Sequence, residues 1–246
     1  MNGDGVADRI VTDGPRVSVV SGKDGRVMVP AFAPFEASYT GALNAVFVDA
    51  TLVVSPGQGG GPVVAVYNLD GTERGRFWGI DYAGFRGGVN LAAGDTNGDG
   101  RADLVVTAGA GGGPRVAIFD GKSLGRDARR LVADFFAFEA SHRGGATAGL
   151  TSGVLIFGAG PGGGPRVRGI DADSLFAGAG VKSLDDLPAA ARRFDRFVGD
   201  PATRKGVALA FTGDDSVTDG PSKVTADSGD GNPVTVYEKP PFGPAV

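Results

Sequence analysis

Short apolar stretches alternate with segments rich in glycine, proline and aspartate along the whole chain. Stretches such as TLVVS, ADLVVTA and GVLIFG are rich in β-branched residues and bounded by glycine, a pattern typical of β-strands. One segment differs. Residues 183–193, SLDDLPAAARR, start with serine and two acidic residues and predict a short helix whose length Pro188 limits. We therefore expect a chain built mainly from strands.

A proline followed by an apolar run recurs five times, in DGPRVSVV, GGPVVAVY, GGPRVAIF, GGPRVRGI and DGPSKVTA. These prolines stand at positions 15, 62, 114, 165 and 221, so the steps between them are 47, 52, 51 and 56 residues. A period near fifty with several strands in each unit is typical of a β-propeller blade or of a β-solenoid coil.

The number of strands in each unit favours the propeller. The unit that starts at Gly88 contains four runs, VNLAAG, ADLVVTA, PRVAIFD and LVADFFAF. The first unit lacks the opening run, and the last contains VALAFT, DSVT, SKVTAD and PVTVYE. We predict an all-β fold, a β-propeller of about five four-stranded blades whose first blade lacks its opening strand. The units lie near 1–40, 41–85, 86–142, 143–203 and 204–237, and a proline-rich tail covers 238–246.

Composition narrows the classes of partner. The net charge of −4 gives no basic field, so nucleic acid is not an expected partner. No apolar run approaches the ~18 residues that a membrane helix needs, so we expect no membrane span. The chain has no cysteine, which excludes disulfides and thiolate metal sites.

The segment DTNGDGRAD is the strongest chemical signal. Asp95, Asn97 and Asp99 occupy alternate positions, Gly100 stands where the chain must bend, and Asp103 adds a carboxylate at position 9. With the backbone carbonyl of Arg101, these hard oxygen ligands suit Ca²⁺. The loop is not an EF-hand, because valine stands at position 12 and strand-like runs flank the loop. The alternative is a solvated turn without an ion, since Asx and Gly residues make turns by themselves.

The N-terminal segment NGDGVAD repeats the last seven residues of this loop pattern without its leading aspartate. We therefore expect the chain to be part of a longer repeat protein. The corresponding segments VDATLVV, LTSGVLI and TGDDSVT of the second, fourth and fifth units are too short for the loop, and we expect no calcium there.

Three further motifs have structural interpretations. GAGPGGGPR, from Gly158, formally contains GxGxxG, but a strand follows and not a helix, so a tight hairpin is favoured over a nucleotide site. His142, the only histidine, corresponds to Tyr39 in another unit and is interpreted as a spacer residue and not as a catalytic one. Trp78 is interpreted as packing between blades, with carbohydrate stacking as the alternative.

Residues between units predict contacts from blade to blade. An acid recurs there as Glu36, Asp81 and Glu139, and we expect it to pair with Arg86 or Arg143 of the neighbouring segments. We also expect inter-blade packing of the recurring phenylalanines, which are Phe32, Phe35, Phe77, Phe135, Phe136 and Phe138.

Together, the units, the DTNGDGRAD loop and the loops ending in GGGP resemble FG-GAP repeats, the blade type of the integrin α-subunit head and of many bacterial surface proteins. The resemblance extends to about Tyr237 and is most specific at Asp95–Asp120. It implies a calcium loop between the first and second strands of a blade. The implied ligands in the third unit are Asp95, Asn97, Asp99, the Arg101 carbonyl and Asp103. In the first unit they are Asn2, Asp4, the Val6 carbonyl and Asp8.

The resemblance favours a non-enzymatic, calcium-stabilised β-propeller at the cell surface or outside the cell, acting as a binding, adhesion or scaffold module. Its expected partner is a protein or a polysaccharide. The alternative is a propeller-type glycoside hydrolase or lyase, which needs acids unique to individual blades. Asp195 and Asp200 are the candidates, because most other acids recur between units or belong to the calcium loop.

Overall fold

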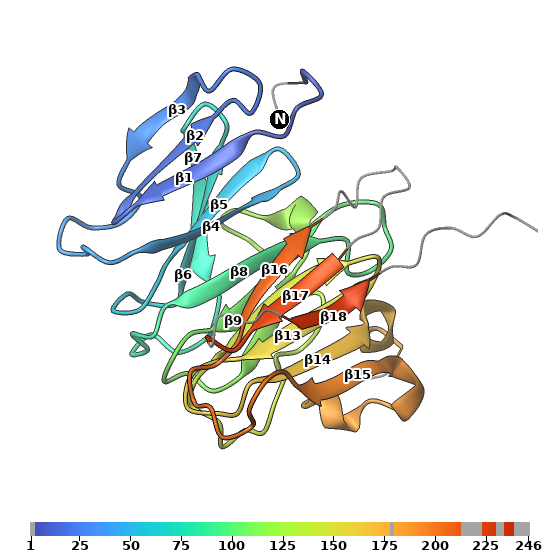
Figure 1. Cartoon of the computed structure of the whole chain (residues 1–246). Coiled ribbons are helices and arrows are strands. Elements are labelled where there is room, and N and C mark those ends of the chain that lie inside the picture. The colour runs from blue at the N-terminus through green and yellow to red at the C-terminus, as the bar shows by residue number, and fades with distance from the viewer. Residues whose placement is uncertain (1–2, 178–179, 213–222, 230–233, 239–246) are drawn as a thin grey trace, which may run out of the picture.

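The computed structural model describes residues 3–177, 180–212, 223–229 and 234–238. Within these ranges the chain forms five antiparallel sheets that follow one another in sequence order (Figure 1). The first sheet contains β1 (Arg9–Asp13), β2 (Arg16–Val20) and β3 (Val27–Phe32). The second contains β4 (Leu43–Val48), β5 (Thr51–Pro56), β6 (Val63–Asn68) and β7 (Glu73–Trp78).

The remaining sheets repeat this order. The third contains β8 (Val89–Gly94), β9 (Asp103–Ala108), β10 (Arg115–Phe119) and the short β11 (Phe135–Phe136). The fourth contains β12 (Ala146–Thr151), β13 (Val154–Ala159), β14 (Arg166–Asp171) and β15 (Arg192–Phe197), and the fifth contains β16 (Ala208–Thr212), β17 (Lys223–Asp227) and β18 (Val234–Glu238). Short 3-10 turns are η1 (Gly121–Ser123), η2 (Ala172–Leu175), η3 (Leu184–Asp186) and η4 (Ala189–Ala191).

Each apolar core lies between two consecutive sheets. In β5, Leu52 and Val54 pack toward the first sheet, whereas Val53 between them packs toward the third. Successive side chains of a strand point to opposite faces, so a strand covered on both faces carries apolar residues at consecutive positions. This explains the continuous LVV and VLIF runs. It also gives four separate cores for the four junctions between the five described sheets.

The first strands of neighbouring sheets are linked by side chains. Asn44 donates a hydrogen bond through Nδ2 to the Val89 carbonyl over 2.8 Å, and Asn90 donates in the same way to the Ala146 carbonyl over 2.8 Å. From the second strand of the third sheet, β9, Thr107 Oγ1 also donates to the Ala146 carbonyl, at 2.6 Å. These bonds fix the inner strands of consecutive sheets side by side, which is the arrangement of adjacent propeller blades.

The all-β prediction is confirmed, and so is the four-stranded unit for the second, third and fourth sheets. The first sheet has three strands, as expected from its missing opening run. The count of five propeller blades stays a prediction. Among the described residues, no strand of the first sheet pairs with a strand of the last.

Two predicted details are wrong. In the fifth sheet, KVTAD was expected to be the third strand, but β17 pairs directly with β16, Phe211 facing Val224, and is therefore the second. The DSVT segment and residues 239–246 of the tail lie outside the described residues. The helix expected over 183–193 is replaced by η3 and η4. Ser183 caps η3 with a capping box, but Pro188, which has no N–H, separates the two turns.

Candidate functional site

The loop between β8 and β9 is the acidic segment Asp95–Asp103. Gly98 and Gly100 adopt φ values of 75° and 79°, a left-handed conformation that favours glycine. These turns direct backbone N–H groups inward. The Asp95 carboxylate accepts hydrogen bonds from the N–H groups of Gly98 (2.8 Å), Asp99 (3.1 Å) and Gly100 (2.8 Å). The side chain at loop position 1 thus organises the backbone of the whole turn.

The middle of the loop is arranged by its own polar side chains. Asn97 Oδ1 accepts from the Asp99 N–H at 2.9 Å, and Asp99 Oδ1 accepts from the Arg101 N–H at 3.0 Å. Lys122 extends from η1 and donates to Asp99 Oδ2 at 2.6 Å. That hydrogen bond is the main reason that the pKa of Asp99 lies below its usual value. Asp99 therefore stays ionised and attracts cations.

Asp103 closes the loop at the first position of β9. Its side chain is buried and accepts hydrogen bonds from Thr96 Oγ1 at 2.6 Å, from the Thr96 N–H at 3.2 Å and from the Gly121 N–H at 3.2 Å. Burial raises the pKa of Asp103 despite these bonds. Three donors compensate part of the desolvation of the carboxylate, and they hold the loop against η1.

Arg101 connects the loop to the preceding unit. Its guanidinium lies 2.9 Å from Asp49 Oδ2, and the Ala102 N–H donates to Asp49 Oδ1 at 3.3 Å. Asp49 lies in the two-residue turn between β4 and β5. The contact between the acidic loop and the Asp49 turn was not predicted from the sequence. It follows only from the way the second and third sheets lie beside each other, which brings their first turns together.

The N-terminal loop has the same local geometry. Asp4 accepts from the Val6 N–H at 2.9 Å, as Asp99 does from Arg101, and Asp8 accepts from the Gly22 N–H at 3.2 Å, as Asp103 does from Gly121. Asn2 lies outside the described residues. The two loops are therefore structural repeats from position 5 to position 9.

The donor set of Asp95–Asp103 fits a hard cation in its chemistry: three carboxylates, one amide oxygen and one carbonyl. Among the described residues, no three His, Cys, Asp or Glu side chains gather as a metal-binding group. The carboxylates face backbone N–H groups, yet each oxygen has a second lone pair available for a further ligand. Calcium at this loop stays a prediction.

The second and fourth units replace the loop with two-residue turns. In these turns Asp49 and Ser152 have positive φ values of 47° and 49°, and the strands pair up to the turn itself, as Val48 does with Thr51. These are tight hairpins without space for a nine-residue loop. The prediction of short turns is confirmed in both units, and the TGDDSVT segment of the fifth extends beyond the described residues.

Two of the three predicted acids, Asp81 and Glu139, form ion pairs between units, but with arginines other than the predicted ones. Asp81 pairs with Arg130 at 2.7 Å, and Glu139 pairs with Arg166. Arg86 and Arg143 were expected as partners, and this is wrong. Each of them instead donates through Nη1 to backbone carbonyls of its own segment: Arg86 to Ala83 and Phe85, and Arg143 to Ala140 and His142. A long arginine side chain can donate either to a carboxylate of the neighbouring unit or to backbone carbonyls of its own segment. Sequence spacing does not show which of these two acceptors it takes.

The aromatic prediction is confirmed for three phenylalanines that contact the next unit. Phe32 packs on Tyr67, Phe77 on Phe119 and Phe135 on Phe157, with ring centroids 4.8, 4.7 and 6.1 Å apart. His142 packs on Phe138 in the slot that Tyr39 fills in the first unit, and burial lowers its pKa. The glycines of GAGPGGGPR connect β13 and β14 as a hairpin, as predicted.

Of the two candidate catalytic acids, Asp195 lies in an ion-pair network. It accepts two hydrogen bonds from Arg166, both 2.7 Å long, and one from Arg168 at 2.9 Å. Burial acts to raise its pKa, but the bonds and charges of the two arginines outweigh burial and lower it. The Asp200 carboxylate accepts a local hydrogen bond from the Ala202 N–H, and the Asp200 carbonyl accepts one from the Thr203 N–H.

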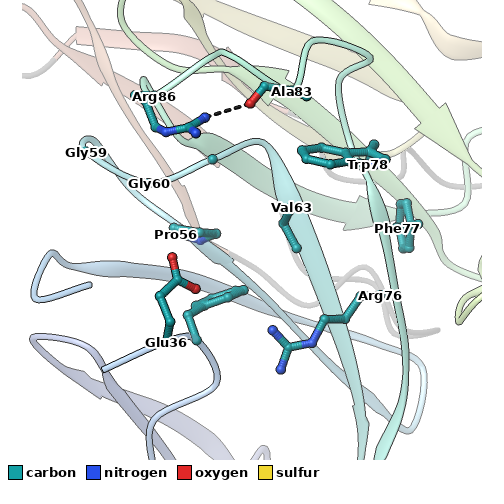
Figure 2. A pocket seen from close by; sticks show the side chains of 12 residues that line it. Glu36, Pro56, Gly59, Gly60, Val63, Arg76, Phe77, Trp78, Ala83 and Arg86 are labelled. Carbon is teal, nitrogen blue, oxygen red and sulfur yellow. Dashed lines mark hydrogen bonds between the residues drawn. The ribbon is translucent and has the colours of Figure 1, made fainter. Parts of the chain in front are cut away.

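An open groove of about 440 Å³ lies between the first and second units (Figure 2). Glu36 and Arg86 lie toward the two ends of the groove. Trp78 and Phe77 lie along one side, and Val63 lies near the middle. Trp78 is 47% exposed, which is high for a tryptophan. The sequence suggested Trp78 as a packing residue, and only the fold shows the groove beside it.

Comparison with known proteins bears on the third unit. The FG-GAP repeat family model matches residues 87–123, a segment that contains β8, the acidic loop, β9, β10 and η1. This segment is an FG-GAP repeat. The resemblance drawn from DTNGDGRAD is confirmed here, and the FG-GAP loop is the one organised by Asp95 and Asp103.

Among solved structures, the chain is similar to a crystal structure of the rhamnogalacturonan lyase YesW, with 14% sequence identity and a TM-score of 0.45. The similarity covers 90% of this chain and 50% of the lyase chain, so the chain spans half the length of that protein. No curated protein matches the chain. Within the described residues, no helix is long and apolar enough to cross a membrane.

Proposed function

We propose that the protein is a non-enzymatic β-propeller module that binds a protein or polysaccharide at the cell surface or outside the cell, and that calcium stabilises it. The observation that carries the proposal is the FG-GAP repeat at residues 87–123 with its ordered acidic loop. Such a loop joins two strands at the edge of a sheet and lies apart from the groove at Trp78.

Calcium acts as a clamp in this proposal. Asp95, Asn97, Asp99, the Arg101 carbonyl and Asp103 hold it, and the corresponding residues Asp4, Val6 and Asp8, with Asn2, form a weaker second loop. Three carboxylates around one turn repel each other without a cation, and Lys122 provides only one positive charge to Asp99. A divalent ion offsets that repulsion and fixes β8, β9 and the Asp49 turn relative to one another.

The ion pairs of Asp195 support binding over catalysis. A general acid needs a raised pKa, whereas the arginines lower the pKa of Asp195 and occupy its oxygens. The sequence alternative, a propeller-type glycoside hydrolase or lyase, would have to use other acids.

The test is binding with product analysis. The purified chain is applied to arrays of immobilised glycans and extracellular proteins, once in about 1 mM calcium, the upper end of the dissociation constants of such modules, and once in chelator. Every bound ligand is recovered and analysed for cleavage. We expect saturable binding that calcium strengthens, with the ligand recovered intact. Cleavage of the ligand, or no binding to any array member, would contradict the proposal.

A further inference from the structure

The junction between the first and second units differs from the next two junctions at one strand position. Val63, Arg115 and Arg166 each follow a Gly-Pro pair at the start of the third strand of a sheet. They face Trp78, Phe136 and Phe197, respectively, on the fourth strand. The three pairs are therefore equivalent places in three sheets, and only the second sheet has an uncharged residue there.

In the fourth unit, the arginine at this place fills the junction. Arg166 binds Asp195 of its own sheet and Glu139 of the preceding unit. In the third unit, Arg115 lies 4.0 Å from Asp134 and over the Phe136 ring, while Arg130 binds Asp81 of the preceding unit. Both junctions thus pair the acid of one unit with an arginine of the next.

In the second unit that arginine is absent, and the space is open. Val63 carries no charge, and no hydrogen bond from another described residue reaches the Glu36 carboxylate, which is equivalent to that of Glu139. The charge of Glu36 acts on Arg76 and contributes to the raised pKa of that guanidinium. Arg76, the nearest arginine, donates to Glu73 and to the Pro34 carbonyl. The result is the groove of Figure 2, with an acceptor at one end and Trp78 along its side.

The opposite end of the groove is a hydrogen-bond donor. Arg86 uses Nη1 for the carbonyls of Ala83 and Phe85, which leaves its Nη2 and Nε without a partner among the described residues. Gly59, Gly60 and Gly61 form the rim beside Arg86, so no side chain closes the approach to it. The groove therefore has an acceptor-only carboxylate at one end and a donor-only guanidinium at the other.

We propose that this groove is a binding site for a neutral saccharide of one or two rings. A sugar hydroxyl both donates and accepts, so one ligand satisfies Glu36 and Arg86 together. A cationic ligand would face Arg86 and Arg76, and an anionic ligand would face Glu36. The apolar face of a pyranose ring stacks on the exposed indole of Trp78, and a volume of about 440 Å³ lies within the range of small-ligand sites. This inference rests on the proposed binding function and names its ligand class and its site.

The chain provides its own probe, because Trp78 is the single tryptophan. A neutral oligosaccharide selected on a glycan array that also carries uronic-acid glycans is titrated while indole fluorescence is recorded. We expect a saturable change in intensity with a dissociation constant in the millimolar range. The same glycan is then titrated by calorimetry against variants.

Val63→Arg is the decisive variant, because it restores the arginine that the third and fourth sheets carry. It is expected to weaken binding at least tenfold while the circular dichroism spectrum stays unchanged. Trp78→Ala should have an equal effect, and Tyr82→Ala, which removes a 63% exposed aromatic side chain that does not line the groove, should have none.

The inference would be overturned by binding of acidic glycans alone, by neutral-glycan binding that Val63→Arg does not change, or by the absence of glycan binding. If the chain instead captures a protein ligand on the arrays, or binds glycans without a fluorescence change, the groove assignment fails while the proposed binding function stands. Absence of every ligand would defeat both.

Discussion

The second and third sheets have the same strand order but differ at two places. The first two strands of the second sheet are joined by a two-residue turn, whereas those of the third are joined by the acidic loop, whose last residue, Asp103, is the first of β9. At the start of the third strand, the second sheet has Val63 beside an open groove, and the third has Arg115 over Phe136. Both sheets have the same order of strands, and both contribute to apolar cores at the junctions with their neighbours. The difference teaches that turn length and a single strand position can change the surface of sheets whose strand order is the same.

Close backbone packing between consecutive sheets predicts the largest effect on stability. Gly88 has φ +66°, and a Cβ there would lie 2.2 Å from the Gly57 carbonyl oxygen of the preceding unit. Gly88→Ala should lower the free energy of unfolding by about 3–5 kcal/mol, because backbone of two sheets must separate. Gly162→Ala is the matched control. Its φ is +95° with nothing within 4 Å of the added Cβ, so it should cost only about 1–2 kcal/mol. Urea denaturation measures both, and equal losses would contradict close backbone packing at Gly88.

The junction between the third and fourth units, which Arg166 fills, predicts the second largest effect on stability. Arg166→Val makes the fourth sheet resemble the second and removes the main partner of Asp195. We expect a loss of about 1–3 kcal/mol at pH 7, since a partly buried carboxylate loses two charge-assisted hydrogen bonds. Arg9→Val, on an exposed residue of β1, is a control that should change stability little.

This effect should depend on pH. The folded-state pKa of Asp195 is lowered, so its contribution to stability is present above the unfolded pKa of about 3.9 and is lost as the pH falls through the folded value. Wild type and Arg166→Val should therefore converge in stability below about pH 4. Denaturation curves that stay equally far apart at acidic pH would show that the loss came from packing and not from the ion pair.

The acidic loop predicts the smallest effect. Extracellular calcium modules bind with dissociation constants of roughly 10⁻⁴–10⁻³ M, so ~1 mM calcium adds only about 0.4–1.4 kcal/mol by mass action. Asp99→Ala should remove the calcium-dependent rise in melting temperature and leave the fold intact, because the cores lie between sheets and away from the loop. Asp49→Asn, in the short turn of the second sheet, should keep most of the rise.

Much of the fold could be predicted from the sequence. The apolar runs after Gly-Pro predicted the strands, and the Asx-Gly pattern predicted the turn at Asp95–Asp103. Both predictions depend on local backbone preferences. Partners across junctions could not be predicted. Whether Glu139 binds Arg143 or Arg166 depends on the register between sheets. The Trp78 groove lies beside Val63, at a place where the third and fourth sheets have arginine, and that equivalence is known only from strand pairing. In the fifth sheet, sequence similarity to other units indicated the third position for KVTAD, but direct pairing with β16 placed it second.

The central claim is that the loop Asp95–Asp103 holds calcium as a structural clamp, and calorimetric titration of the metal-free chain with calcium tests it most directly. We predict heat from a principal site with a dissociation constant of roughly 10⁻⁴–10⁻³ M. That heat should disappear in Asp99→Ala and persist in Asp4→Ala, which alters only the N-terminal loop. No calcium heat with the wild-type chain, or equal binding by Asp99→Ala, would contradict the account and leave the loop as a turn stabilised by its own hydrogen bonds.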